Sequence, residues 1–193
     1  MTLCFATNNL HKISEVQALV GSGFPLMGLQ DIGCLEELAE EQNTLEGNAW
    51  QKASYVFEHY HVSCFADDTG LEVKALGGAP GVFSARYAGP QRSADDNIRV
   101  LLNNLENHSD RSAQFRTVIC LMQDSQPHYF EGVLSGTIIH EKRGTNGFGY
   151  DPVFVPNGQS RTLAEMTLAE KNTISHRAQA MQKFIMYLHQ LKS

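Results

Sequence analysis

The stretch from Val62 to Gly70 constrains the fold and chemistry of this chain more than any other. It reads Val-Ser-Cys-Phe-Ala-Asp-Asp-Thr-Gly, an apolar run that ends in two adjacent carboxylates, a hydroxyl and a glycine. Such a run favours a buried strand. If the strand carries Asp67 and Asp68 to its carboxyl end, they lie at the rim where open α/β sheets bind ligands. Successive strand residues point to opposite faces, so we expect only one carboxylate to face a ligand.

Composition excludes several classes of protein. The chain has 193 residues, 42% of them apolar, which is enough for one folded domain over residues 1–193. No apolar stretch is long enough to span a membrane, and the start lacks the pattern of a secretory signal. The net charge of −6 argues against nucleic acid as a partner. We therefore expect a cytoplasmic protein with reduced thiols at the scattered Cys4, Cys34, Cys64 and Cys120.

The spacing of apolar residues predicts alternating helices and strands early in the chain and two long strands later. This order indicates one α/β unit on a mixed sheet rather than a purely parallel sheet. A loop is expected over 31–43. We expect strands over 3–6, 24–29, 62–68, 115–122 and 129–139. Helices are expected over about 12–20, 44–60 and 93–105, the last with a capping box of Ser93 and Asp96, then over a short segment capped by Thr167 and Glu170, and from about Ser175.

Three further segments favour a phosphate or nucleotide site. Lys12 follows a strand and a polar turn at the start of a helix, where free N–H groups attract anions. His176 and Arg177 open the last helix, a position that the helix dipole makes unfavourable for cations unless a ligand or carboxylate is near. Phe148 stands between two glycines and could stack on a base. With Asp68, Lys52 and Lys171, these residues match the needs of a carboxylate, divalent-metal and polyphosphate site.

Each of these pieces also has a plainer interpretation. The Asp pair with Thr69 and Gly70 could be an Asx-type turn that closes a strand. The turn before Lys12 could be an ordinary capped helix start, because no Walker A or dinucleotide fingerprint is present. Phe148 could be a core residue in a tight turn, and Arg177 could be exposed or paired with a surface carboxylate. Taken singly, none of the motifs decides between the two interpretations.

Five ordered motifs together resemble the inosine triphosphatase family, also called XTP/dITP diphosphatases. The resemblance covers essentially the whole chain and implies an elongated mixed sheet flanked by helices, with two lobes around a cleft and a homodimer. It implies Mg²⁺-dependent hydrolysis of ITP, dITP or XTP to the monophosphate and pyrophosphate, which cleanses the nucleotide pool. The motifs are Ala6-Thr7-Asn8-Asn9-x-x-Lys12, Ala66-Asp67-Asp68-Thr69-Gly70-Leu71, Gly78-Ala79-Pro80-Gly81-x-x-Ser84-Ala85-Arg86-Tyr87, Phe148-Gly149-Tyr150-Asp151-Pro152 and Ile174-Ser175-His176-Arg177.

The resemblance also implies roles for individual residues. Asp68 would be a metal ligand and the catalytic base, and Thr69 would touch the substrate. Glu40 fits best as the second metal carboxylate, with Glu41 and Glu46 as competitors. The first loop departs mildly from the family, because Asn8 or Asn9 replaces a usual glycine. The triphosphate would be bound by Thr7, Asn8, Asn9, Leu10, His11, Lys12, Lys52 and Lys171, and the base by Phe148, Gly149, Tyr150, Asp151, His176 and Arg177.

Two other functions fit the same residues. A metal-dependent phosphohydrolase that releases orthophosphate would also use paired carboxylates, although Asp67-Asp68-Thr69 lacks the D-x-D-x-T spacing of the haloacid dehalogenases. A nucleotide-sensing module would bind the same ligand without turnover. The products formed from ITP distinguish all three functions.

Overall fold

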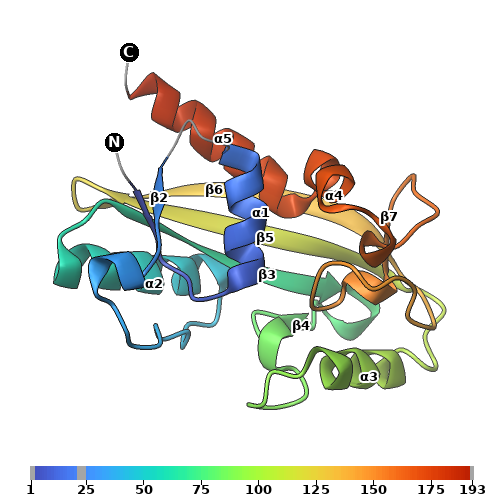
Figure 1. Ribbon diagram of the computed structural model, residues 1–193. Helices are drawn as coiled ribbons and strands as arrows, with labels where there is room; N and C mark the ends of the chain where they lie inside the picture. Colours follow the sequence, from blue (N-terminus) through green and yellow to red (C-terminus); the bar gives the residue numbers. More distant parts are fainter. Residues whose placement is uncertain (1–2, 21–24, 192–193) are drawn as a thin grey trace. The chain divides into compact units, whose positions relative to one another are not determined.

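The computed structural model describes residues 3–20 and 25–191 (Figure 1). Strands and helices alternate through the first half of this part of the chain, and the two longest strands follow one another in the second half. The α-helices are α1 Leu10–Val20, α2 Leu45–Tyr60, α3 Ala94–Asn104, α4 Leu168–Ile174 and α5 His176–Gln190. The strands are β1 Leu3–Phe5, β2 Leu26–Met27, β3 Cys64–Val73, β4 Pro80–Gly81, β5 Ser112–Gln123, β6 Gln126–Ile138 and β7 Phe154–Pro156.

The predicted mixed sheet is confirmed. Its strand order is β2-β1-β3-β5-β6-β7, and β4 pairs with β3. Strand β1 is parallel to both β2 and β3, whereas β4 is antiparallel to β3 and β7 to β6. Strands β5 and β6 are joined by Asp124 and Ser125, which both have positive φ (49° and 61°), as the tight turn of an antiparallel hairpin requires.

The chain forms two compact units. The first contains residues 1–68, 117–132 and 177–193, and the second contains residues 69–116 and 133–176. The backbone therefore passes from one unit to the other four times, between residues 68 and 69, 116 and 117, 132 and 133, and 176 and 177. Each unit has its own apolar core.

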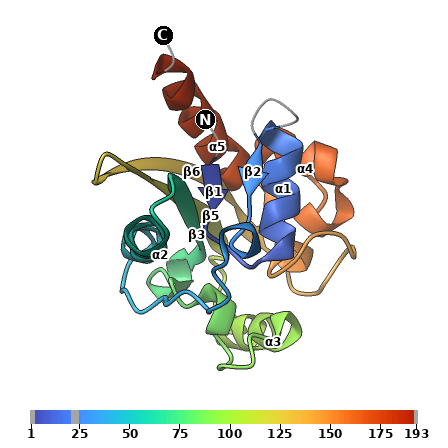
Figure 2. The same ribbon diagram turned by 60° about the vertical axis from the view of Figure 1, so that its left-hand side comes forward.

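The core of the first unit occupies both faces of its strands, because strand residues alternate in direction. On one face Cys4, Cys64 and Cys120 pack against α2, and on the other Phe5 and Phe65 pack against α1 and α5. The rings of Phe5 and Phe65 stack with centroids 4.6 Å apart. Figure 2 shows α1 and α2 on opposite sides of β1 and β3. Burial of these side chains is the main force that holds the helices to the strands.

The core of the second unit gathers the apolar side of α3 with residues from β3, β5 and the 150–166 region. Ser93 caps α3 by accepting a hydrogen bond from the Asp96 N–H at 3.2 Å, as the sequence predicted. The predicted cap of α4 is also confirmed, because Thr167 and Glu170 form a reciprocal capping box. The α3 residues in this core are Ile98, Leu101 and Leu105, with Leu102 packed against it.

Several predicted boundaries need correction. Strand β3 does not end at the Asp pair but continues to Val73, because Leu71 and Glu72 pair with β4. Helix α1 begins at Leu10 rather than near Lys12. In α5 Phe184 is buried and the neighbouring Ile185 is half-buried, as is Tyr60 at the end of α2. The predicted helix end at residues 21–23 and the start of the 24–29 strand lie outside the described residues.

Among residues 3–20 and 25–191, none of the helices combines the length and the apolar character needed to cross a bilayer.

Candidate active site

Strand β3 brings Asp67 and Asp68 to a point just beyond the end of its neighbour. The last Cα pair between β1 and β3 is Phe5 with Phe65, so the Asp pair begins two residues later. Here β1 turns into the loop that enters α1, which leaves room for side chains from α1 and α2 to approach β3. The rim geometry expected from the sequence therefore arises from the end of β1 rather than from the end of β3.

Asp67 is buried among cations on the α1 side of the strand. Its carboxylate lies 2.8 Å from Nζ of Lys12 and 3.0 Å from Nε of Arg177. The guanidinium of Arg177 also pairs with Glu15 of α1, so a buried carboxylate lies on either side of it. Burial alone would raise the pKa of Asp67, but Lys12, Arg177 and Lys52 outweigh it and hold this pKa well below its usual value.

The loop before Lys12 is built by Asn9. Its side-chain oxygen accepts hydrogen bonds from the backbone N–H groups of His11 (3.0 Å) and Lys12 (3.2 Å), and so caps α1. The Thr7 hydroxyl accepts a hydrogen bond from the Asn9 N–H at 3.2 Å. Asn9 thus occupies the N–H groups of His11 and Lys12, which a phosphate could otherwise use. Residues 8–11 are exposed.

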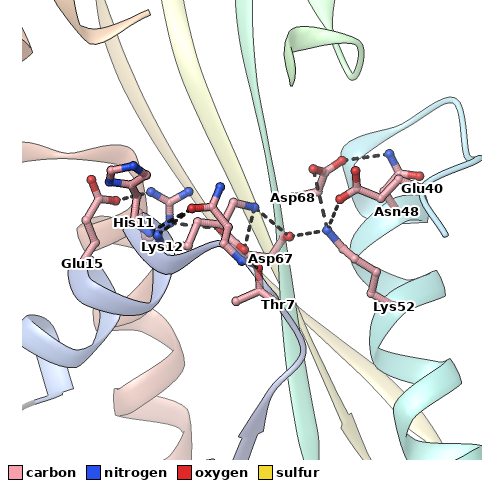
Figure 3. A network of polar contacts seen from close by, with 11 residues as sticks. Thr7, His11, Lys12, Glu15, Glu40, Asn48, Lys52, Asp67 and Asp68 are labelled. Carbon is pink, nitrogen blue, oxygen red and sulfur yellow. Dashed lines mark hydrogen bonds and ion pairs between the residues drawn. The ribbon is translucent and has the colours of Figure 1, made fainter. Parts of the chain in front are cut away.

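Asp68 faces the opposite way, toward α2. Its carboxylate accepts a hydrogen bond from Nδ2 of Asn48 at 3.0 Å and lies 4.0 Å from Nζ of Lys52. Burial raises the pKa of Asp68, and the nearby ammonium groups of Lys52 and Lys12 offset this only in part. The opposite faces predicted for the Asp pair are therefore confirmed, and each carboxylate has its own set of partners (Figure 3).

Lys12 and Lys52 converge on one backbone oxygen. Nζ of Lys52 lies 2.8 Å from the carbonyl oxygen of Asp67, and Nζ of Lys12 lies 3.3 Å from the same atom (Figure 3). The two lysines come from α1 and α2, on either side of β3. Each ammonium group also pairs with a carboxylate, Lys12 with Asp67 and Lys52 with Glu40, so both cations are held at this point of β3 by buried or half-buried acidic partners.

Lys52 also lies between the two carboxylates proposed as metal ligands. Its Nζ is 2.6 Å from Oε1 of Glu40 and 4.0 Å from Oδ1 of Asp68. These carboxylates raise the pKa of Lys52 against the effect of its burial. Of the three candidate glutamates, Glu40 is the one for which the structure gives an ion pair with Lys52, whereas Glu41 is exposed and Glu46 lies in the first turn of α2.

The donor set at this point fits Mg²⁺. Mg²⁺ prefers oxygen ligands and is usually bound by one or two carboxylates together with substrate phosphates and water. Asp68 and Glu40 supply two carboxylates within reach of one cation, the Lys52 ammonium. Throughout the described chain there is no group of three or more His, Cys, Asp or Glu side chains placed to hold a metal.

The second unit contains the other predicted cluster. Lys171 and Asp151 form a buried ion pair at 2.6 Å, and Nζ of Lys171 also lies 4.9 Å from the centre of the Phe148 ring. The Phe148 N–H donates to the Asp151 carboxylate at 3.0 Å. Gly147 has a positive φ of 73°, and a Cβ there would meet Oδ2 of Asp151 at 2.1 Å. Lys171, predicted to bind triphosphate, thus joins Phe148 and Asp151, which were predicted to bind the base.

Tyr150 and His176 belong to the same unit and are both buried. The Tyr150 hydroxyl donates to the Ser84 carbonyl at 2.9 Å, and burial raises its pKa above its usual value. The ring of His176 stacks on Phe115 with centroids 4.9 Å apart. Gly149 has a positive φ of 61°, which the turn after Phe148 requires. Thr69 is half-buried in β3.

Sequence reasoning did not single out Glu15 and Asn48, although both are buried at the site. Glu15 is 3% exposed and pairs with Arg177, whereas Asn48 is 1% exposed and holds Asp68. The spacing of each residue from a predicted lysine could have identified it. Glu15 lies three residues after Lys12 and Asn48 four residues before Lys52, so each shares a helix face with a predicted lysine.

A mixed α/β sheet with buried lysines and carboxylates beyond the end of a parallel strand places the chain among the α/β proteins that bind ligands at this edge of the sheet. The chain belongs to the Ham1 family, whose model matches residues 3–187. It is 51% identical to a dITP/XTP pyrophosphatase of Flavobacterium johnsoniae over 96% of both chains, and 52% identical to one of Porphyromonas gingivalis over 93% of both. A solved HAM1 protein from Coxiella burnetii matches with a TM-score of 0.90 and 38% identity, over 98% of this chain and 100% of that one.

Proposed function

We propose that this chain is a pyrophosphatase of non-canonical purine nucleoside triphosphates, hydrolysing dITP, ITP and XTP to the monophosphate and pyrophosphate. The curated relatives named dITP/XTP pyrophosphatases support this activity, because they match nearly the full length of the chain. The observation that carries the proposal is the convergence of Lys12 and Lys52 on the Asp67 carbonyl, beside the carboxylates of Asp68 and Glu40. A triphosphate and a divalent cation need this combination of charges.

The residues of the first unit divide the chemistry among them. Lys12 and Lys52 would bind phosphate oxygens and neutralise the charge that develops as the α-phosphorus is attacked. Mg²⁺, held by Asp68 and Glu40, would supply charge neutralisation for the leaving pyrophosphate and acidify the attacking water. Asp68 would accept the proton of that water, a task that a weak base can perform once the cation has acidified the water. Asp67 would hold Lys12 in position rather than react.

We assign recognition of the base to Phe148, Asp151 and His176, with Gly149 and Tyr150 shaping the loop. Phe148 would stack on the purine, since its ring is held by the Lys171–Asp151 pair. A donor to the carbonyl at purine position 6 would be left unpaired against the amino group of adenine, which rejects ATP. Arg177 remains our candidate for such a donor, but it would have to exchange Glu15 or Asp67 for the base.

The test is a panel of dITP, XTP, ITP, GTP and ATP with Mg²⁺, with separate assays for pyrophosphate and orthophosphate. The proposal expects pyrophosphate from the first three nucleotides and little product from GTP or ATP. Orthophosphate without pyrophosphate would favour the rival phosphohydrolase. Tight dITP binding without either product, in wild type and Asp68→Asn alike, would favour a nucleotide sensor.

We further propose that the whole chain acts as one catalytic domain, that it forms a homodimer and that it works in the cytoplasm, where it would cleanse the nucleotide pool. Four buried free cysteines suit a reducing compartment. The homodimer rests on the resemblance of the motifs, and light scattering on the purified protein tests it by mass. A monomer at working enzyme concentration would remove the dimer from the proposal without affecting the reaction.

A further inference from the structure

The segment that carries Glu40 has little regular structure of its own. Residues 33–43 form neither helix nor strand, and Glu40 lies near the middle of this run. Two apolar side chains, Cys34 and Leu38, are buried in the core beside α2. Ordering an irregular segment costs conformational entropy at each residue, so the position of the Glu40 carboxylate depends on what else ties the segment down.

Two hydrogen bonds hold the segment on the carboxyl side of Glu40. The Gln42 N–H donates to Oδ1 of Asn48 at 2.9 Å, and the Glu41 N–H donates to the Gln51 side chain at 3.0 Å. The same Asn48 donates through Nδ2 to Asp68. One buried amide thus connects the segment of Glu40 to the carboxylate of Asp68.

Two further hydrogen bonds hold the segment on the amino side, at Glu36, four residues before Glu40. Oε1 of Glu36 accepts hydrogen bonds from the hydroxyls of Tyr55 and Tyr60, both at 2.8 Å. The two tyrosines come from the last turns of α2, the helix that also carries Asn48 and Lys52. Hydrogen bonds to an ionised acceptor are stronger than those between neutral groups. The two phenols lower the pKa of Glu36, which agrees with an ionised acceptor.

We propose that Glu36, Tyr55 and Tyr60 form a positioning latch that holds the Glu40 carboxylate in place for the divalent cation. The inference rests on the proposed function, because it assumes that Glu40 is a metal ligand. The three residues touch neither substrate nor metal in this role. The latch and the Asn48 amide hold the segment against α2 on both sides of Glu40, so that α2 sets the spacing of Glu40 and Asp68.

The latch hydroxyls do not fill the core. The Tyr55 ring stacks on His59 with centroids 4.1 Å apart, and the Tyr60 ring packs against the core beside α2. The double variant Tyr55→Phe/Tyr60→Phe therefore removes both hydrogen bonds and keeps both rings. Glu36→Gln removes the charge from the other side. If all three groups act as one unit, the triple variant should weaken Mn²⁺ binding little more than the double variant or Glu36→Gln does alone.

The experiment measures Mn²⁺ binding to the full chain by electron paramagnetic resonance, and hydrogen exchange of peptides covering residues 33–43. Because two hydrogen bonds to a charged group are lost, we expect Mn²⁺ binding about tenfold weaker in the double variant. Exchange of the 33–43 peptides should accelerate by a similar factor. The apparent KM for Mg²⁺ in dITP hydrolysis should rise, with kcat recovered at saturating Mg²⁺, an outcome that a general loss of stability would not give.

Tyr187→Phe is the matched control, because it removes a hydroxyl that contacts His128 in the same unit and should change none of these quantities. Wild-type Mn²⁺ affinity and exchange in the double variant would overturn the latch. If the wild type binds Mn²⁺ but releases no pyrophosphate from dITP, the proposed function fails and the latch is still judged by the first two measurements. A wild type that binds no Mn²⁺ would remove the metal site, and the latch with it.

Discussion

The side chains of Asp67 and Asp68 leave β3 in opposite directions and meet opposite electrostatic conditions. Asp67 contacts two cations, Lys12 and Arg177, and its pKa is lowered. Asp68 contacts the neutral Asn48 and has a cation, Lys52, only at 4.0 Å, and burial raises its pKa. The Asp67 carboxylate therefore stabilises the fold. The Asp68 carboxylate lowers the stability of the metal-free protein, and a bound cation would relieve this cost.

The first prediction separates stability from activity at Asp68. Asp68→Asn should lower kcat for dITP by about a thousandfold, because a metal carboxylate and the proposed base are both lost. It should also raise the free energy of unfolding of the metal-free protein at neutral pH by about 1 kcal/mol, since a poorly solvated charge is removed. Calorimetry in EDTA, beside a pyrophosphate assay, measures both effects. Retained turnover would exclude Asp68 as base and ligand.

Asp67→Asn should act mainly on stability, whereas Asp68→Asn acts mainly on turnover. Removing this carboxylate leaves Lys12 and Arg177 with one fewer buried partner, which should cost about 3–5 kcal/mol of the free energy of unfolding. Folding lowers the pKa of Asp67, so its contribution is complete above about pH 4, the pKa of an unfolded aspartate, and is lost as the pH falls further.

Thermal unfolding of wild type and Asp67→Asn between pH 7 and pH 3 checks this contribution. The advantage of the wild type should stay constant from pH 7 to about pH 4 and begin to shrink between pH 4 and pH 3, because the lowered pKa of Asp67 keeps its carboxylate ionised in the folded protein over this range. Parallel curves across the range would show that the Asp67 carboxylate contributes no pH-dependent stability.

The sequence predicted those parts of the fold and site that depend on local patterns. The α2 boundaries followed from apolar spacing, and the Asp pair followed from its place after an apolar run. The continuation of β3 past Asp68 was missed, because it depends on pairing with the two-residue strand β4, which has no periodicity to detect. The Glu15–Arg177 pair was missed for a similar reason, since 162 positions separate its members.

A mutation should distinguish the role of Lys52 from the role of the proposed metal ligands that it contacts. Lys52→Gln removes an ammonium that competes for the carboxylates of Glu40 and Asp68. Mn²⁺ binding in the absence of nucleotide should therefore become severalfold tighter. The KM for dITP should rise by about tenfold, because a charged contact to phosphate is lost. Weaker Mn²⁺ binding together with the raised KM would instead make Lys52 a structural support of the metal site.

The last prediction concerns the Lys171–Asp151 pair under the Phe148 ring. Lys171→Met keeps the length of the side chain but removes the charge that pairs with Asp151 and faces the ring. If the pair holds Phe148 for stacking, the variant should lose more kcat/KM for dITP than binding of inorganic triphosphate, which has no base to stack. Phe148→Leu should show the same pattern, since it removes the ring directly.

Glu170→Gln, at the neighbouring half-buried position of α4, is the control: glutamine can keep the capping box with Thr167 and loses only the charge that pairs with Arg161, so both quantities should stay near wild type. Equal losses for dITP and inorganic triphosphate in Lys171→Met would return Lys171 to the triphosphate-binding set in which the sequence motifs first placed it. The comparison thus decides between two roles for one buried lysine, and its result does not depend on how strongly the variant lowers overall stability, because both ligands are measured on the same folded protein.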